Sequence, residues 1–176
     1  DTPGAVGDEE AATVLRCFEA AGAGGALRSD DGDTAEAFFA ARRLAYPALE
    51  RLGPLLTEDV CVPRTRVTEM LEAIEATGAR HGVTIANIAH AGDGNLHPLF
   101  VVPAGDDDAR RRAQLAFDDI IAAAIALGGT VSGEHGIGLL KRAGLAAQVG
   151  PDVLALYAAV KHALDPAGIL NPGKIV

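Results

Sequence analysis

Residues 83–102 read VTIANIAHAGDGNLHPLFVV, and this stretch decides the fold class. Two runs rich in Val, Ile, Leu and Phe, Val83–Ala89 and Leu96–Val102, predict strands, because such side chains favour extended backbone. The Gly-Asp-Gly-Asn segment between them is a strong turn signal, so we expect the two strands to form a hairpin. A hairpin at this position favours a mostly antiparallel sheet.

Apolar residues at helical spacing surround this hairpin on both sides. Helices are expected over five segments: 8–22, 34–52, 64–81, 107–127 and 151–164. The first two should turn an apolar face inward, with Phe18 and Phe38 among the buried residues, and short strands are expected at 58–62 and 130–132. The prediction is an α+β fold: a mostly antiparallel sheet flanked by helices, followed by a C-terminal helical segment.

Composition and charge exclude several classes of protein. The 176 residues amount to about one domain, and 49% hydrophobic with 22% charged residues is ordinary for a soluble globular chain. No apolar run approaches the roughly 18–20 residues of a membrane span, and no signal peptide opens the sequence. The net charge of −9 argues against nucleic acid, since the basic cluster Arg110–Arg112 follows Asp106–Asp108 as at a helix start.

The two cysteines and the first residues carry smaller signals. Cys17 and Cys61 lie outside any CxxC pattern and are interpreted as buried free thiols in a reducing compartment. The opening Asp1-Thr2-Pro3 is not an initiator sequence. We interpret it as a cut through a longer protein, with removal of a leader as the alternative.

Three of the five histidines fall in two glycine-rich turns, HAGDGNLH at 90–97 and SGEHGIG at 132–138. A tight hairpin would bring His90 and His97 to one point, and Glu134 or His135 would then supply a third ligand. Imidazole and carboxylate suit a divalent first-row metal, and three protein ligands leave positions open for substrate. His81 and His162 lie at helix ends, where a structural role is expected.

The glycines of these two turns permit positive φ and close approach of a flat ligand to the backbone. They are Gly92, Gly94, Gly133, Gly136 and Gly138. Neither run reads GxGxxG, and no GxxxxGK[ST] occurs, so nucleotide-phosphate binding of those two kinds is not supported.

The two turns, in this order and followed by DPAGILNPGKIV at 165–176, resemble a known family. The chain is similar to the C-terminal part of FAD-linked oxidases of the vanillyl-alcohol-oxidase type. The branch is that of D-lactate dehydrogenase, the glycolate oxidase flavin subunit and D-2-hydroxyglutarate dehydrogenase. Segments 39–43 and 59–63 also resemble the family, so the likeness covers essentially the whole chain.

The resemblance implies roles for seven residues. It implies that His90, His97 and Glu134 ligate a divalent metal (Zn, Mn or Fe) and that His135 is the catalytic base. It also implies that Arg42 holds the substrate carboxylate, that Asn95 lies near substrate and flavin, and that Asn171 lies near the isoalloxazine. The implied reaction oxidises a lactate- or glycolate-like D-2-hydroxy acid to the 2-oxo acid, with hydride passing to FAD.

The sequence departs from the family pattern in places. Phe39 stands where a tryptophan is common, and Thr57 stands where the hydroxyglutarate branch has a lysine. The family binds FAD mainly through an N-terminal domain absent from these residues. Residues 1–140 therefore resemble a truncated, ferredoxin-like cap, and 141–176 a helical segment that returns to that domain.

The implied partners are a small 2-hydroxy acid, the missing FAD-binding domain and an electron acceptor. A homodimer is also expected, together with a cytoplasmic location or attachment to the periphery of the inner membrane. Two other readings stay open. One is a metal-dependent phosphoesterase, in which Asp93 would help to bind a second metal. The other is a cap or interaction module that has no activity of its own.

Overall fold

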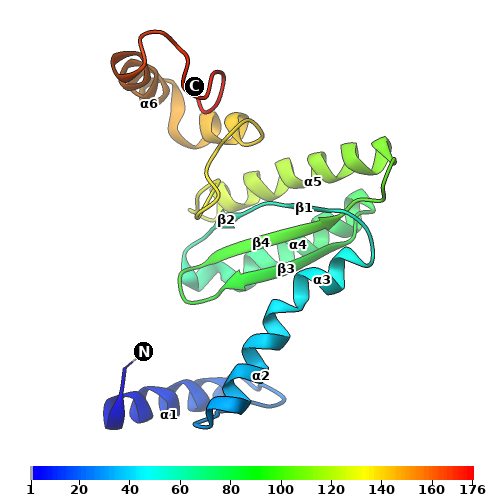
Figure 1. Ribbon diagram of the computed structural model, residues 1–176, viewed down its shortest axis with the longest axis vertical. Helices are drawn as coiled ribbons and strands as arrows, with labels where there is room; N and C mark the ends of the chain where they lie inside the picture. The colour runs from blue at the N-terminus through cyan, green and yellow to red at the C-terminus, as the bar shows by residue number, and fades with distance from the viewer. Residues whose placement is uncertain (1) are drawn as a thin grey trace. The chain divides into compact units, whose positions relative to one another are not determined.

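The computed structural model describes residues 2–176, which divide into two compact units that meet between Pro47 and Ala48. The first unit holds α1 (Gly4–Ala20) and α2 (Gly32–Arg43), and α3 (Ala45–Glu50) crosses the boundary (Figure 1). Asp31 caps α2 by accepting a hydrogen bond of 2.8 Å from the Thr34 amide.

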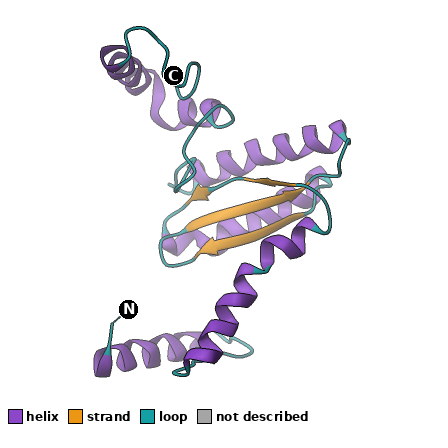
Figure 2. Ribbon diagram, in the orientation of Figure 1, coloured by secondary structure: helices purple, strands orange, loops and turns teal. Residues whose placement is uncertain are grey.

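The second unit is built on a four-stranded antiparallel sheet around β4 (Asn95–Val101). β3 (Ile85–His90) pairs with one edge of β4, in register from Ile85 opposite Phe100 to His90 opposite Asn95. β1 (Leu55–Thr57) and β2 (Val60–Cys61) pair with successive stretches of the other edge. The predicted hairpin and the α+β class with a mostly antiparallel sheet are therefore confirmed (Figure 2).

One face of this sheet packs against α4 (Val67–His81), which follows the short helix η1 (Arg64–Arg66), and α5 (Asp107–Ala126). Leu96 and Phe100 of β4 join the core on this face, where the Phe100 and Phe117 rings meet edge to face at 6.1 Å. Since side chains alternate along a strand, Asn95 and His97 lie on the opposite face. The sheet thus separates the hydrophobic core from the face that carries the histidines.

The short strands differ from expectation. The strand predicted at 58–62 is reduced to Val60–Cys61, and the one predicted at 130–132 is a single bridge between Thr130 and Cys61. β1 was not predicted, because three residues are too few to show an alternating pattern.

The helix predicted over 34–52 is wrong as a single element, because α2 ends at Arg43 and α3 begins at Ala45. Pro47 explains the break: its ring clashes with the carbonyl four residues earlier, at Arg43, and it has no N–H to donate.

The expected burial of the first two helices is also wrong. Phe18 of α1 is 50% exposed and Phe38 of α2 is 47% exposed, and no residue of either helix is buried among the described residues. An apolar helical stripe needs a second layer to cover it, and residues 2–47 bury neither stripe. Cys17 is free but exposed rather than buried, while Cys61 is free and half-buried.

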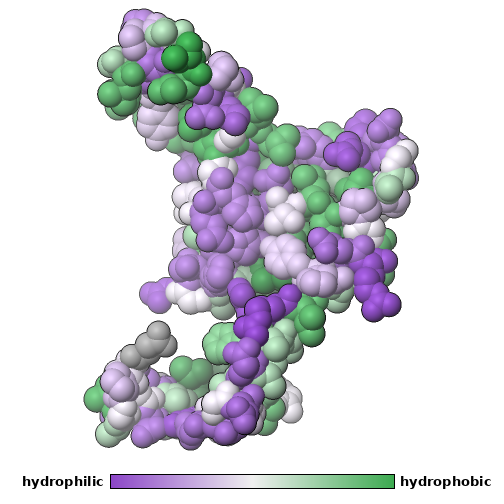
Figure 3. Space-filling model, viewed as in Figure 1, coloured by the Kyte–Doolittle hydropathy of each residue, from purple (hydrophilic) through white to green (hydrophobic). Residues whose placement is uncertain are grey.

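The last helix, α6 (Arg142–Leu164), begins nine residues before the predicted helix at 151–164. Gly150 is non-helical (φ 74°, ψ 175°) and Pro151 follows it, so α6 consists of two pieces. As a whole, α6 has the length and composition of a membrane span, but each piece is shorter than the about 20 residues a span needs. Apolar side chains of α6, such as Leu164, are exposed, and Figure 3 shows hydrophobic surface on this part of the chain.

Candidate functional site

The hairpin β3–β4 places two histidines side by side on the face of the sheet away from the helices. His90 ends β3 and lies opposite Asn95, while His97 lies opposite Ile88. Residues paired across antiparallel strands, and residues two apart along one strand, share a face, so both imidazoles project the same way. Their ring centroids are 5.3 Å apart.

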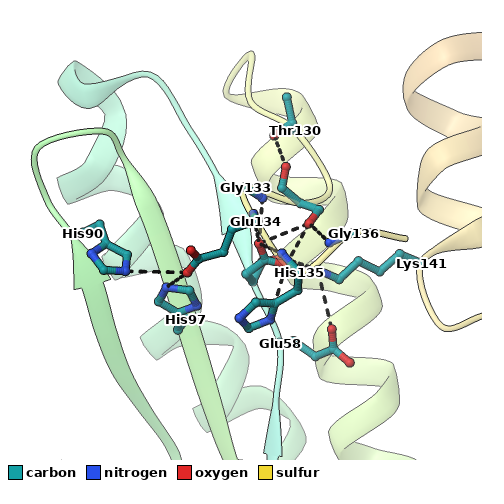
Figure 4. Close-up of polar contacts among 11 residues, drawn as sticks. Glu58, His90, His97, Thr130, Gly133, Glu134, His135, Gly136 and Lys141 are labelled. Carbon is teal, nitrogen blue, oxygen red and sulfur yellow. Dashed lines mark hydrogen bonds and ion pairs between the residues drawn. The ribbon is translucent and has the colours of Figure 1, made fainter. Parts of the chain in front are cut away.

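Glu134 reaches these two rings from the second glycine-rich turn (Figure 4). Its Oε1 lies 3.0 Å from Nε2 of His97 and 3.6 Å from Nε2 of His90. The three ligand atoms all lie within 4.8 Å of one another. Two imidazole nitrogens and one carboxylate oxygen at this spacing fit a divalent first-row metal, and they leave coordination positions free.

The three candidate ligands differ in burial. The His97 side chain is only 5% exposed, whereas His90 and Glu134 are 45% and 53% exposed. Burial, and then the neighbouring His135 ring, lower the pKa of His97. A lowered pKa favours the neutral imidazole, which is the form that binds a metal. Nδ1 of His97 is buried without a hydrogen-bond partner among residues 2–176.

A buried carboxylate, Asp59, holds the second turn. One of its oxygens, Oδ2, accepts hydrogen bonds from three consecutive backbone amides, of Gly133 (2.7 Å), Glu134 (2.7 Å) and His135 (3.1 Å). The Ser132 hydroxyl donates to the same carboxylate at 3.0 Å and accepts from the Gly136 amide at 2.8 Å. Three successive N–H groups around one oxygen form an anion-binding nest of backbone dipoles.

Lys141 compensates the charge of this carboxylate. Its ammonium donates to Asp59 Oδ1, donates to the Asp59 carbonyl at 2.7 Å, and lies 3.6 Å from Glu58 (Figure 4). Burial alone would raise the pKa of Asp59, but hydrogen bonds from Lys141 and from the amides of Glu134 and His135 hold it well below its usual range. Burial raises the pKa of Glu58 despite the nearby Lys141.

His135 stands beside the three candidate ligands. Its ring centroid is 5.0 Å from that of His97, and its Nδ1 lies 3.7 Å from Asp59 Oδ1. The side chain is 36% exposed. With Nδ1 toward the buried carboxylate, Nε2 is the nitrogen available to a substrate proton.

The remaining predicted residues are placed less directly. The Asn95 side chain is almost fully buried, since the residue is 5% exposed. Its Oδ1 has no hydrogen-bond partner in the described chain, and its side-chain amide lies against Gly133. Asn171 is exposed and adopts a positive φ of 46°. Arg42 belongs to the other unit, where it lies exposed in the last turn of α2. The roles of these three residues stay predictions.

Among residues 2–176, the geometry brings together only one group of three metal-ligating side chains, that of His90, His97 and Glu134. The Asp93 carboxylate instead accepts a hydrogen bond from the backbone amide of Asn95 at 3.1 Å. His81 pairs with Asp119 at 2.7 Å, and His162 lies exposed in the last turn of α6. A second metal site, which the phosphoesterase reading needs, therefore has no support in the described residues.

Sequence reasoning missed Asp59 and Lys141. Asp59 lay inside a predicted strand, and its pairing with Glu58 ahead of apolar residues was a signal that a buried cation stands nearby. Lys141 follows two leucines and is separated from Asp59 by 82 residues, so no local pattern joins the two.

Comparison with known proteins places these residues in context. A family model described as "FAD linked oxidases, C-terminal domain" matches residues 1–175. The chain is 40% identical over 156 residues to glycolate oxidase subunit GlcD of Bacillus subtilis, an alignment that covers 86% of the chain and 33% of the relative. GlcD of Escherichia coli strain K12 is 39% identical over 138 residues, with 78% of the chain and 28% of the relative covered.

A probable mitochondrial D-lactate dehydrogenase of Danio rerio is 35% identical over 151 residues, with 84% of the chain and 30% of the relative covered. The chain thus spans about a third or less of the length of each of these three relatives.

Proposed function

This chain belongs to the family of FAD-linked oxidases, as their C-terminal domain, and from that premise we propose that it forms the substrate side of a 2-hydroxy-acid dehydrogenase. The proposed reaction oxidises a D-2-hydroxy acid of the lactate or glycolate type to the 2-oxo acid. Relatives named as glycolate oxidase subunits and as a D-lactate dehydrogenase support this substrate class.

The convergence of His90, His97 and Glu134 is the observation that carries the proposal. Their ligand atoms come from a hairpin and from a distant loop, yet they lie within 4.8 Å of one another. When bound, a divalent cation would polarise the substrate hydroxyl, and the flavin would accept the hydride. The three side chains would hold the cation with positions left for the hydroxy acid.

His135 is the proposed base. Removing two electrons as hydride from Cα must be matched by loss of the hydroxyl proton, and Nε2 of His135 is the proposed acceptor. The Asp59 carboxylate lies 3.7 Å from Nδ1 and is proposed to orient the ring so that Nε2 faces the substrate. Arg42 is proposed to fix the substrate carboxylate, a role for which guanidinium geometry is suited.

FAD is proposed to bind mainly to a domain outside these residues. Asn171, and Asn95 if its amide becomes accessible, are the proposed contributions of this chain to the flavin site. Residues 141–176 are proposed to return to that domain, with 1–140 forming the cap. In the structure the tail contacts the second turn, since the Ile175 amide donates to the Gly138 carbonyl at 3.0 Å.

The test is a substitution series in the full-length protein that contains this chain. His97→Ala and Glu134→Ala should each lower kcat/KM on D-2-hydroxy acids by more than about 100-fold, because each removes a metal ligand. His81→Ala, a histidine outside the site, is the matched control and should retain activity. Loss of less than about tenfold in both ligand variants would refute the metal assignment.

The isolated 176-residue chain gives a second test. It should bind zinc but be colourless and inactive on D-2-hydroxy acids, because most flavin contacts lie elsewhere. Visible flavin absorbance in the purified chain would contradict this. The electron acceptor, a homodimer, and a cytoplasmic or inner-membrane-peripheral location stay predictions from the family resemblance.

A further inference from the structure

We propose that Asp59 is the positioning residue of this site: its buried carboxylate shapes the turn 132–136 so that Glu134 and His135 face the hairpin histidines. This inference rests on the proposed function, because positioning matters only if Glu134 binds a metal. It assigns a catalytic purpose to a charge that would otherwise serve only the stability of the core.

The hydrogen bonds of the turn converge on Asp59. Three consecutive amides, from Gly133 to His135, all donate to Oδ2 of Asp59, and the Ser132 hydroxyl donates to the same group. The backbone of the two residues that carry the proposed ligand and base is therefore wrapped around one atom. A neutral amide at position 59 offers one acceptor oxygen and adds two N–H donors, so it cannot serve these donors and Lys141 together.

Asp59 is linked to the hairpin by backbone hydrogen bonds on both sides. The next two residues form β2, where Val60 pairs with Leu96 and Cys61 pairs with Asn95 on the strand that carries His97. On the other side, the Glu58 amide donates to the Pro98 carbonyl at 3.3 Å. Asp59 thus lies between two attachments to β4, and its position relative to His97 is set by backbone hydrogen bonds.

β2 also holds the segment that leads into the turn. The Cys61 amide donates to the Thr130 carbonyl at 3.1 Å, and the Thr130 amide donates back at 2.7 Å. The turn is therefore attached to β2 at Thr130 by backbone and at Ser132–His135 by the Asp59 side chain. Without the second attachment, the first would leave the Glu134 side chain free to swing away from His97.

Lys141 has a different part in this arrangement. Its side chain is 2% exposed, and it compensates the charge of Asp59 without touching the turn's amides. Replacing it by Met should weaken folding while leaving the amides hydrogen-bonded to Asp59. A role in positioning and a role in stability can therefore be separated by comparing the two members of the ion pair.

The experiment uses the full-length protein, with zinc affinity measured by competition titration and the absorption spectrum of the Co²⁺-substituted protein as a report on ligand geometry. Asp59→Asn should lower zinc affinity by about 10- to 100-fold and change the Co²⁺ spectrum. Lys141→Met should lower the urea midpoint of unfolding, with zinc affinity and spectrum close to those of the parent. Glu58→Gln is the matched control, because Glu58 is the neighbouring buried acid and its side chain contacts Lys141 but not the turn. The zinc affinity of the Glu58→Gln protein should stay within about threefold of the parent.

Ser132→Ala keeps the proposal testable if Asp59→Asn does not fold. It removes one donor to Asp59 and the acceptor of the Gly136 amide at a half-buried position, and it should lower zinc affinity by about three- to tenfold. An unchanged Co²⁺ spectrum in folded Asp59→Asn, or in Ser132→Ala where the former is insoluble, overturns the proposal. So does an equal loss of affinity in Lys141→Met and Asp59→Asn.

The outcomes also separate this inference from the proposed function. If His97→Ala abolishes zinc binding while Asp59→Asn leaves it unchanged, the metal site stands and only the positioning role falls. If the parent protein and His97→Ala bind zinc equally, the metal site itself falls, and the positioning proposal falls with it.

Discussion

The two glycine-rich turns contain similar residues, but they are held in different ways. The turn after His90 is closed mainly by its own backbone: the Asp93 and Gly94 amides donate to the His90 carbonyl, and the Asp93 carboxylate accepts from the backbone amide of Asn95. Its one backbone bond to a distant segment is from the Val62 amide to the Gly94 carbonyl, at 3.0 Å. The turn around Glu134 sends its amides to Asp59, which is 74 to 76 residues earlier in the chain. A locally closed turn is set by its own sequence, whereas a turn closed by a distant carboxylate needs the folded sheet first.

The largest effect is expected from a substitution that disrupts the first turn. Gly94 has φ 81°, and a Cβ there would overlap the Val62 carbonyl oxygen, so Gly94→Ala meets both backbone strain and a clash. It should lower the free energy of unfolding by about 3 kcal/mol in urea titrations. Gly92→Ala is the control, because nothing lies within 4 Å of its Cβ position, and should change stability by less than about 0.5 kcal/mol. Equal losses in both variants would contradict the clash and the backbone strain at Gly94.

A smaller effect is expected from the equivalent change in the second turn. A Cβ on Gly133 would overlap the side-chain amide of Asn95, so Gly133→Ala must shift either that side chain or the turn. The expected cost is about 1–2 kcal/mol of stability, together with a loss of zinc affinity of about tenfold. Adding Asn95→Ala removes the overlapping atoms, so the double variant should recover zinc affinity. A strictly additive double variant would contradict this contact.

The third prediction concerns the tail that contacts the second turn. Hydrogen bonds from Lys161 and from the Leu170 and Ile169 amides hold the pKa of Asp165 below its usual range. Its stabilising effect is complete above the unfolded pKa of about 4 and is lost as the pH falls through the folded value. Asp165→Asn should therefore lower the Tm by a few degrees at pH 7, and the difference from the parent should shrink below about pH 4.

Scanning calorimetry over this pH range measures the effect. Asp152→Asn, a change at an exposed acid in α6, is the control and should follow the parent at every pH. A Tm difference for Asp165→Asn that stays constant down to pH 2 would show that the carboxylate charge is not what organises the tail.

The smallest effect is expected at Asp93, and it tests whether the hydrogen bond within the first turn stabilises that turn. Asp93→Ala loses one hydrogen bond, to the Asn95 amide, and should cost about 1 kcal/mol. Asp93→Asn keeps an acceptor oxygen and should stay within about 0.5 kcal/mol of the parent in the same urea titration. An equal loss in Asp93→Asn and Asp93→Ala would indicate that the charge of Asp93, which both variants remove, matters more than its hydrogen bond.

Much of the candidate site could be predicted because its residues occur in short, distinctive runs. The spacing of His90 and His97 around a turn signal predicts a hairpin, and a hairpin brings these rings together by geometry alone. Glu134 could be named as a third ligand but not placed, because its position depends on the Asp59 network. Asp59 and Lys141 were missed: the adjacent acids Glu58 and Asp59 hint at a buried cation, but an ion pair between distant residues leaves no periodic pattern that identifies Lys141.

The burial of helices α1 and α2 could not be predicted from the sequence, although the helices themselves could. The spacing of Phe18 in α1 and Phe38 in α2 correctly indicates helices with an apolar stripe, yet both side chains are about half exposed. Periodicity reports which residues share a face, but it does not report whether any layer covers that face. Pro47 is the contrasting case, because the break it causes between α2 and α3 follows from covalent geometry and was readable in the sequence.

The sequence by itself determined the β3–β4 hairpin, most of the helical segments and the nearness of His90 to His97, because these depend on turn chemistry and on side-chain spacing along a few neighbouring residues. Only the tertiary structure decided where Glu134 and His135 lie. Their turn takes its shape from the carboxylate of Asp59, which the β2–β4 ladder and the buried Lys141 bring to it from 73 or more residues away. Local forces act over a few residues, while a charge buried in a folded core acts between any two segments that the fold brings into contact.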